Sequence, residues 1–179
     1  MFSMNNKHVV ITGGHGHLGH AMTECILDAG GFVSIFGRNS DIFFKRFKNY
    51  NKNVLWFNVD ISKNESIKQG IKDSISNFKT IDVLINNSYY CKFNGNSEKM
   101  TDNEWEYGVD GTLNSVYRCI RQALPHMKTG SSIINIASMY GMVSPDFRIY
   151  DDHKGYLSPP SYGASKAGVI QLTRYFASY

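Results

Sequence analysis

The feature that most constrains the fold is a glycine-rich turn that joins an apolar strand to an amphipathic helix. Residues 7–12 (KHVVIT) form a short β-branched run, typical of a strand buried on both faces of a parallel sheet. The turn 13–19 (GGHGHLG) and a helical pattern over 18–29 follow. The predicted apolar side of this helix comprises Leu18, Met22, Ile26 and Leu27. Glycines let a ligand approach the backbone and a helix N-terminus offers free amides, so the arrangement favours a pyrophosphate site; a plain tight turn is the alternative.

Strand and helix patterns alternate along the rest of the chain. Further strands are predicted over 32–36, 54–59, 81–85 and 131–137, and a polar loop over 89–99. A capping-box pattern at 62–65 opens one helix, whose apolar face is Ile67, Ile71, Ile75 and Phe78. A long helix over 102–127 has a predicted buried side of Trp105, Val109, Leu113, Val116, Tyr117, Ile120 and Leu124. The alternation predicts a doubly wound α/β fold on a parallel sheet, in a single domain over 1–179.

The residues that follow the second strand, Gly37, Arg38 and Asn39, bear on the choice of nucleotide. Sites that prefer NAD usually place an acid here to bind the ribose 2′-hydroxyl, whereas an arginine accommodates the 2′-phosphate of NADP. Arg38 stands here and no acid does, so NADP is favoured over NAD. A plain surface arginine is the alternative.

Near the C-terminal end, Tyr162 and Lys166 are four positions apart in a segment with helical spacing. Residues at this spacing lie on one face of a helix. A free tyrosine has a pKa of about 10, and a neighbouring ammonium favours the phenolate. The pair could therefore serve as a general acid or base, although the same spacing also arises by chance.

Composition describes an ordinary soluble globular protein, with 42% hydrophobic and 19% charged residues. A net charge of +4 suits an anionic small molecule as well as nucleic acid. The basic run 45–48, interleaved with Phe43, Phe44 and Tyr50, favours a solvated helix face with inward aromatics over a nucleic-acid surface.

Cysteine and histidine usage points to a metal-free protein of a reducing compartment. The three cysteines are odd in number and widely spaced, so we expect free thiols. No leader or membrane-length apolar run is visible, so we expect a cytoplasmic protein without a membrane partner. A zinc ion bound by His15, His17 and His20 would occupy the phosphate site, and we expect instead that these are turn and first-turn residues.

Five short motifs, in this order, carry a family resemblance: TGGHGHLG, VDI, INN, IAS and YGASK. Together they resemble the short-chain dehydrogenase/reductase family over essentially the whole chain. The family has a Rossmann-type fold and consists of nicotinamide-dependent enzymes, mostly oxidoreductases that act on alcohols and carbonyls. The resemblance therefore implies an NADP-dependent oxidoreductase with a small-molecule substrate.

The resemblance also implies a role for each matching residue. Tyr162 would exchange a proton with the substrate oxygen, Lys166 would bind the nicotinamide ribose and assist the tyrosine, and Ser138 would donate to the reacting oxygen. The cofactor residues implied are Gly13, His15, Gly16, His17, Leu18, Gly19, Arg38, Asp60, Ile61 and Asn86. Three of these residues have a structural alternative: Ser138 could cap the strand end, Asp60 could N-cap the next helix, and Asn86 could form a hydrogen bond to a neighbouring turn.

The chain departs from the family pattern in four places. His17 replaces the middle glycine of the single-domain branch, and the spacing through Gly16 is that of the extended branch of nucleotide-sugar epimerases and dehydratases. Ser88 and Tyr89 introduce bulk after the paired asparagines, and Thr112 stands where the family has a catalytic asparagine. Ser138 and Tyr162 are far apart for the single-domain branch. The extra segment 145–160 would shape a polar pocket or be a surface excursion.

Three functional hypotheses remain open on the sequence. The first is hydride transfer between NADP and a carbonyl or secondary alcohol, for which a sugar-like substrate is one interpretation. The second is a truncated or degenerate relative that binds nucleotide without turnover, and the third is an epimerase or dehydratase type. Family members continue past the Tyr–Lys helix, so we expect the C-terminal strands to be missing and a homodimer or homotetramer to cover the open sheet edge.

Overall fold

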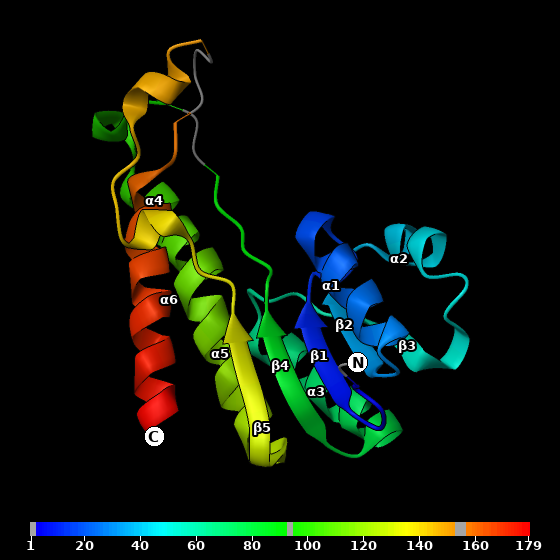
Figure 1. The fold of residues 1–179 in the computed structure, drawn as a ribbon. Helices are drawn as coiled ribbons and strands as arrows, with labels where there is room; N and C mark the ends of the chain where they lie inside the picture. Colours follow the sequence, from blue (N-terminus) through cyan, green and yellow to red (C-terminus); the bar gives the residue numbers. More distant parts are fainter. Residues whose placement is uncertain (1–2, 93–94, 153–156) are drawn as a thin grey trace. The chain divides into compact units, whose positions relative to one another are not determined.

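The computed structural model describes residues 3–92, 95–152 and 157–179, and within them five strands form one sheet of order β3-β2-β1-β4-β5. The pairs β1–β2, β1–β4 and β2–β3 are parallel. The strand bounds are β1 (His8–Thr12), β2 (Phe32–Gly37), β3 (Val54–Asn58), β4 (Ile81–Asn86) and β5 (Met127–Asn135). Helices alternate with the strands along the chain (Figure 1), which confirms the doubly wound α/β prediction.

The helices are α1 (His17–Asp28), α2 (Ser40–Arg46), α3 (Asn64–Phe78), α4 (Asp102–Val109), α5 (Ser115–Ala123) and α6 (Pro160–Ser178). By its internal contacts the chain divides into two compact units. The first unit comprises residues 1–88 and 118–134, and the second comprises 89–117 and 135–179. No helix of the described residues is long and apolar enough to cross a bilayer.

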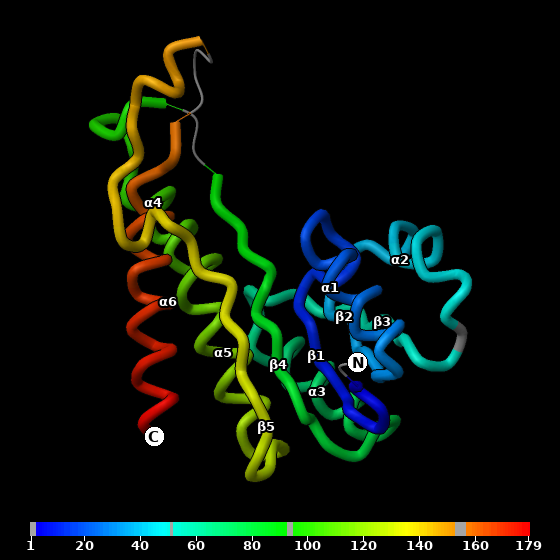
Figure 2. The backbone as a smooth tube through the Cα atoms, in the orientation of Figure 1, coloured from blue at the N-terminus to red at the C-terminus, as the bar shows by residue number. Residues whose placement is uncertain are grey.

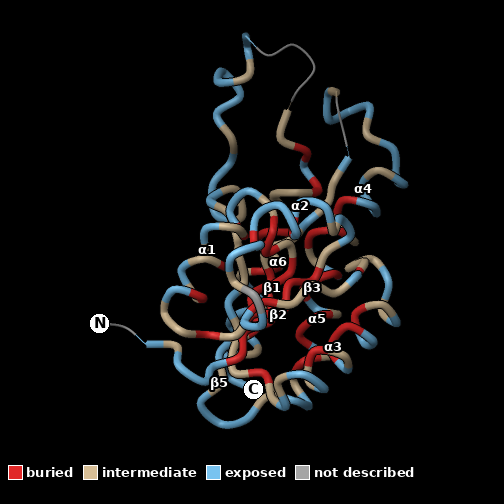
Figure 3. Tube along the Cα trace, turned by 90° about the vertical axis from the view of Figure 1, so that its right-hand side faces the viewer, coloured by how far each residue is buried: buried red, intermediate tan, exposed pale blue. Residues whose placement is uncertain are grey.

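The core of the first unit lies on its central strands. All five residues of β1 are buried, and so are four consecutive residues of β2 (Figure 3). Helix α1 packs on β1 and β2, and α3 packs on β2 and β3. Strands covered on both faces are expected to be continuously apolar, as residues 9–11 at the centre of β1 are. Each fully buried valine or isoleucine contributes about 1.5–3 kcal/mol through the hydrophobic effect.

A buried polar network sits within this core. His8 is 2% exposed, and its Nδ1 lies 2.5 Å from the carbonyl oxygen of Thr80. Its Nε2 lies 2.9 Å from Oγ of Ser34, which accepts a 2.7 Å hydrogen bond from Ser74. A neutral ring that carries its proton on Nδ1 donates to Thr80 and accepts from Ser34, so every member is satisfied. The network joins β1, β2 and α3 in the interior.

The buried stripe of α1 differs from the predicted one. Leu18 is 62% exposed, and the fully buried residues are Gly19, Thr23 and Leu27. The helix begins so close to the preceding turn that only a residue without a side chain fits at the first contact, and Leu18 points away. The prediction was based on the spacing of apolar side chains, so it could not include a packing contact made by a glycine.

The capping box predicted at 62–65 is wrong. Helix α3 starts at Asn64, and its N-cap residue Lys63 makes no side-chain capping bond. Ser62 instead donates through its amide and hydroxyl to Asp60, at 3.0 and 2.8 Å. Ser62 therefore forms a turn with the Asp60 carboxylate instead of capping helix α3. The apolar face is confirmed for Ile67 and Ile71, which are buried.

The predicted long helix over 102–127 is interrupted. A π-helical turn (Asp110–Asn114) separates α4 from α5, and residues 124–126 form a 3₁₀ turn. The extra residue of a π turn rotates the following side chains relative to the preceding ones. The predicted buried side is confirmed for Val116 and Ile120 and wrong for Trp105 and Tyr117, which are 41% and 43% exposed.

The bounds of the fifth strand also differ from the prediction. Strand β5 starts at Met127 and ends at Asn135, so it is displaced toward the N-terminus from the predicted 131–137. The predicted loop at 89–99 contains a 3₁₀ turn at Ser97–Lys99, and its residues 93–94 lie outside the described residues.

Acid should destabilise the fold through His8. Burial lowers the pKa of His8, against smaller opposing effects of the Thr80 hydrogen bond and the Asp82 charge. The folded pKa is then below the unfolded value of 6.5, so the stabilisation is complete above pH 6.5 and lost as pH falls through the folded pKa. Urea unfolding between pH 8 and pH 5 should show a free energy of unfolding that decreases toward acid, by at most about 1.4 kcal/mol per pH unit for one proton.

The variant His8→Gln should flatten that profile while lowering stability at pH 8. His15, whose pKa burial also lowers, is the second contributor, so His15→Gln serves as the comparison. An unchanged pH profile in His8→Gln would show that the network does not govern acid stability.

Candidate active site

The turn between β1 and α1 is built on close backbone approach (Figure 2). Gly13 has φ +65°, and its amide donates to the carbonyl of Phe36 at 2.7 Å. The Gly13 carbonyl accepts from the amide of Gly16 at 2.8 Å. A Cβ on Gly19 would lie 2.1 Å from that same carbonyl oxygen. The turn therefore requires glycine at 13 for its conformation and at 19 for its packing.

The N-terminus of α1 is suited to an anion. Gly16 is the N-cap residue, and no side chain among the described residues caps the helix. The first-turn amides are thus left for an outside acceptor, next to the positive end of the helix dipole. His17 and Leu18 are exposed at the start of the helix, so neither fills the turn. A pyrophosphate fits this cradle although His17 replaces a glycine.

His15 is buried against the end of β2. It is 8% exposed, and a Cβ on Gly37 would lie 2.1 Å from its ring carbon Cε1. Its Nδ1 has no hydrogen-bond partner among the described residues. Arg46, from α2, donates through Nη1 to the carbonyls of His15 and Gly16 at 2.8 and 2.9 Å. Burial first, and the Arg46 charge second, lower the pKa of His15.

Arg46 was missed by the sequence reasoning, which placed the basic run 45–48 on a solvated helix face. Arg46 is exposed, as expected for a solvated helix face, but its hydrogen bonds to the turn were not predicted. The aromatic prediction is confirmed for Phe43, which is buried, and wrong for Phe44, which is 66% exposed. No sequence signal links Arg46 to a turn some 30 positions earlier.

The other predicted cofactor residues follow β2, β3 and β4. Arg38 is exposed. Burial acts to raise the pKa of Asp60, but the hydrogen bonds from Ser62 and the charges of Arg38 and Lys63 outweigh it and lower the pKa. Ile61 is half-buried, and Asn86 is 3% exposed at the end of β4. The predicted residues of this unit therefore stand at the carboxyl ends of parallel strands, where ligands of such sheets bind.

Asn87 and Ser88 connect the end of β4 to the glycine turn. Asn87 donates through its side-chain amide to the carbonyls of Thr12 and Gly13, at 3.0 and 3.3 Å. A Cβ on Gly13 would lie 2.3 Å from Oγ of Ser88. The serine expected to add bulk therefore packs into the space that glycine leaves free.

In the second unit, α6 carries Tyr162 and Lys166. Lys166 is 3% exposed, and its Nζ donates to the carbonyl of Ile136 at 2.5 Å. The same nitrogen lies 5.4 and 5.6 Å from the ring centroids of Tyr89 and Tyr162, which are 5.3 Å apart. Burial lowers the pKa of Lys166. The ring of Tyr89, which with Ser88 adds bulk after the paired asparagines, therefore lies next to Tyr162 and Lys166.

Ser138 and Thr112 belong to the same unit as this pair. Oγ of Ser138 accepts a 3.2 Å hydrogen bond from the amide of Tyr140 and caps the 3₁₀ turn Met139–Gly141. This uses an acceptor site and leaves the hydroxyl proton free to be donated. Thr112 is fully buried in the π turn, and its Oγ1 has no partner among the described residues. Capping by Ser138 is therefore compatible with the predicted role.

Comparison with known proteins assigns the family. The model of the short chain dehydrogenase family matches residues 7–178. The chain belongs to this family. Its members are oxidoreductases that bind nicotinamide cofactors.

Similar proteins agree with this assignment. The chain is 28% identical to a probable 2,4-dienoyl-CoA reductase of Bacillus subtilis, over 97% of this chain and 66% of that protein. It is 26% identical to a 3-oxoacyl-[acyl-carrier-protein] reductase of Chlamydia trachomatis, over 94% and 66%. The crystal structure of an NADPH-dependent 3-quinuclidinone reductase from Rhodotorula rubra matches with TM-score 0.85 and 25% identity, over 99% and 66%. The chain thus spans about two thirds of the length of its curated relatives.

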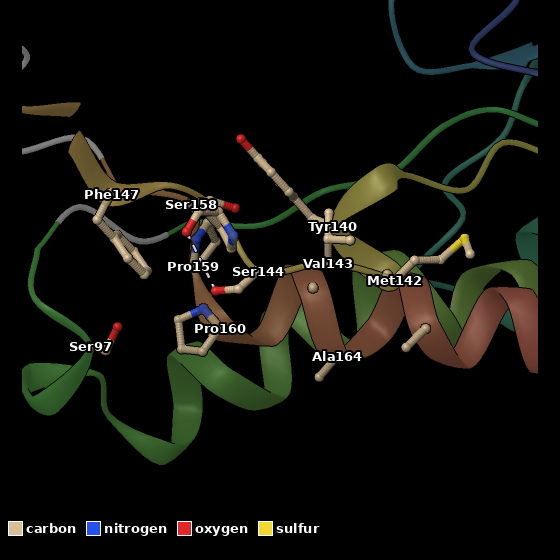
Figure 4. Close-up of a pocket in the computed structure, with 14 residues that line it drawn as sticks. Ser97, Tyr140, Met142, Val143, Ser144, Phe147, Ser158, Pro159, Pro160 and Ala164 are labelled. Carbon is tan, nitrogen blue, oxygen red and sulfur yellow. Dashed lines mark hydrogen bonds between the residues drawn. The ribbon is translucent and has the colours of Figure 1, made fainter. Parts of the chain in front are cut away.

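The segment after Ser138 forms a cavity on α6 (Figure 4). Its volume is about 430 Å³. The lining residues are Ser97, Tyr140, Gly141, Met142, Val143, Ser144, Pro145, Phe147, Ser158, Pro159, Pro160, Gly163, Ala164 and Ala167. None of these carries a formal charge. The lining positions of α6 differ from the face shared by Tyr162 and Lys166. Part of the predicted pocket segment 145–160 lies here, and its residues 153–156 lie outside the described residues.

The close contact at Gly19 predicts a strong position dependence for alanine. In Gly19→Ala the new Cβ meets the Gly13 carbonyl at 2.1 Å, so the turn must shift, with a loss of about 1–3 kcal/mol in the free energy of unfolding. In the control Gly16→Ala the nearest atom is 3.1 Å away, and the loss should be smaller. Urea unfolding of both variants measures the difference. Equal stabilities would show that α1 is not held against the Gly13 carbonyl.

Proposed function

We propose that this chain provides the nucleotide-binding and catalytic parts of an NADPH-dependent oxidoreductase that interconverts a carbonyl and a secondary alcohol. The observation that carries the proposal is the setting of Lys166. Lys166 is 97% buried, donates to one carbonyl and lies close to the Tyr162 ring. Burying an ammonium lowers stability, and groups buried in this way cluster at functional sites, so we infer a catalytic role for Lys166. The exposed anion cradle of α1 supplies the second requirement, a place for a dinucleotide.

The residues of the second unit divide the proton chemistry among themselves. The bound nicotinamide supplies the hydride. The Tyr162 hydroxyl gives its proton to the substrate oxygen, and the Ser138 hydroxyl donates a hydrogen bond to the same oxygen as negative charge develops. Because burial lowers the pKa of Lys166, its ammonium releases a proton more readily than an exposed lysine does and can reprotonate Tyr162. In oxidation the same groups act in reverse.

A cofactor preference for NADPH follows from the charge at the end of β2. Arg38 stands there, and the carboxylate of Asp60, which feels the charge of Arg38, already accepts hydrogen bonds from Ser62. A guanidinium stabilises a 2′-phosphate, whereas a site for the 2′-hydroxyl of NADH usually has an acid at the position of Arg38. The similar quinuclidinone reductase is itself described as NADPH-dependent, which supports this preference.

Two substrate classes are favoured by different observations. The similar reductases are named for acyl substrates bound to coenzyme A or a carrier protein, which favours a 3-oxoacyl thioester. The charged and aromatic residues of the segment 145–160, which follows Ser138, favour a hydroxylated, sugar-like carbonyl compound. Acetoacetyl-coenzyme A and a keto-sugar are therefore the first two compounds to assay. Binding without turnover is the second candidate function, because Thr112 replaces an asparagine and its buried hydroxyl has no partner among the described residues.

NADPH should stabilise the chain more than NADH does. At a concentration one hundred times the dissociation constant, a ligand that binds only the folded state adds about 2.7 kcal/mol. Thermal unfolding against increasing NADPH and NADH measures both shifts. A larger shift with NADPH supports the proposed cofactor. No shift with either nucleotide would contradict the proposed site, and a larger shift with NADH would contradict the preference.

Replacing Tyr162 by Phe should separate catalysis from binding. The variant loses the proton donor, so turnover should fall by about 10²- to 10⁴-fold, while the affinity for NADPH changes little. Tyr175→Phe is the matched control, since Tyr175 lies on the same helix and is 59% exposed. Steady-state rates and NADPH titration give the two readouts. If turnover survives in Tyr162→Phe, the catalytic assignment is wrong; if the wild-type chain binds NADPH but turns over neither substrate, the binding role is favoured.

A further inference from the structure

Arg46 is the cation that reaches the glycine turn. The turn 13–19 contains no arginine or lysine. Helix α2 instead brings the Arg46 guanidinium to the carbonyls of His15 and Gly16, where Nη1 donates at 2.8 and 2.9 Å. Two carbonyl acceptors fix the plane of the group and its position along the turn. The side chain is exposed all the same, so solvent or a ligand can reach it.

The hydrogen-bonding capacity of this guanidinium is only partly used. The group has five N–H donors, of which the two on Nη1 point to the turn. Within the described chain, no hydrogen bond or ion pair occupies Nε or Nη2 of Arg46. Three donors in a fixed plane match the oxygens of a phosphate monoester. Because the side chain is already ordered by its bonds to the turn, binding costs less conformational entropy.

A second observation at the same place points to a ligand. The Nδ1 atom of His15, a residue that is 92% buried, has no partner within the described chain. The His15 ring packs on Gly37, directly before Arg38 and at the end of β2. Buried polar atoms are usually hydrogen-bonded, so a group that binds here can complete this atom. The residue that carries the unpaired nitrogen is also the one whose carbonyl accepts from Arg46, and the Arg46 charge acts on its ring.

We propose that Arg46 is a specificity-determining residue for the cofactor: it holds the turn with Nη1 and binds the 2′-phosphate of NADPH with its remaining donors. The proposal rests on the proposed function and extends it, because Arg38 was the residue expected to make this choice. Arg38 is exposed and lies near the charge of Asp60. Arg46 is fixed by two backbone contacts, which gives it the more defined geometry.

The test measures binding of four probes to the 179-residue chain by isothermal titration. NADPH and 2′,5′-ADP carry the 2′-phosphate, whereas NADH and 5′-AMP lack it. The variants are Arg46→Met, Arg46→Lys and Lys45→Met. Lys45 lies next to Arg46 in α2, is exposed and carries the same charge, so Lys45→Met controls for the loss of one positive charge. Arg46→Lys keeps the charge but loses the planar fork, and it remains informative if Arg46→Met does not fold.

We expect Arg46→Met to weaken NADPH and 2′,5′-ADP about 10- to 100-fold and to change NADH and 5′-AMP much less. Arg46→Lys should fall between, and Lys45→Met should stay within about twofold of wild type. Equal weakening of all four probes would mean that Arg46 only supports the turn, and unchanged binding would mean that it has no role; both overturn the proposal. A wild-type chain that binds none of the probes would overturn the proposed function as well.

Discussion

The first unit of this protein depends on one close contact, that of helix α1 with the carbonyl of Gly13. The contact is possible because Gly19 has no side chain, and it places the start of the helix directly behind the turn. That position leaves the first-turn amides free for an anion and exposes Leu18. In the same turn, the carbonyls of His15 and Gly16 accept hydrogen bonds from Arg46 of α2. A packing constraint of one glycine thus sets up the chemistry of the cradle.

The second unit uses burial in a comparable way. Lys166 is removed from water, and one carbonyl and two aromatic rings replace its hydration. Desolvation disfavours the ammonium and makes its proton easier to transfer, which is the property that a relay to Tyr162 requires. The π turn that interrupts the helix 102–126 places Thr112 in the interior, where the family has an asparagine. Irregular helical turns of this kind often mark functional positions.

Two of the four departures from the family pattern are accommodated in space. His17 leaves the turn open because it is exposed, and Ser88 fits beside Gly13 because that residue lacks a Cβ. The predictions that failed share one cause. The capping box at 62–65 and the buried Leu18 were each inferred from local spacing, and each was overruled by a contact: the hydrogen bonds from Ser62 to Asp60 and the packing of Gly19 on the turn. Local patterns cannot register such competition, because its partners lie elsewhere in the chain or depend on backbone geometry.

The sequence by itself determined the parallel α/β fold, the order of its elements, the family, and the candidate residues of the turn and of the Tyr–Lys pair. These follow from periodicity and from short motifs, in which all the information is local. Only the tertiary structure revealed the orphan nitrogen of His15, the guanidinium of Arg46 on the turn and the burial of Lys166. These features depend on contacts between residues some 30 positions apart and on burial. Neither can be predicted from the spacing of side chains along one segment.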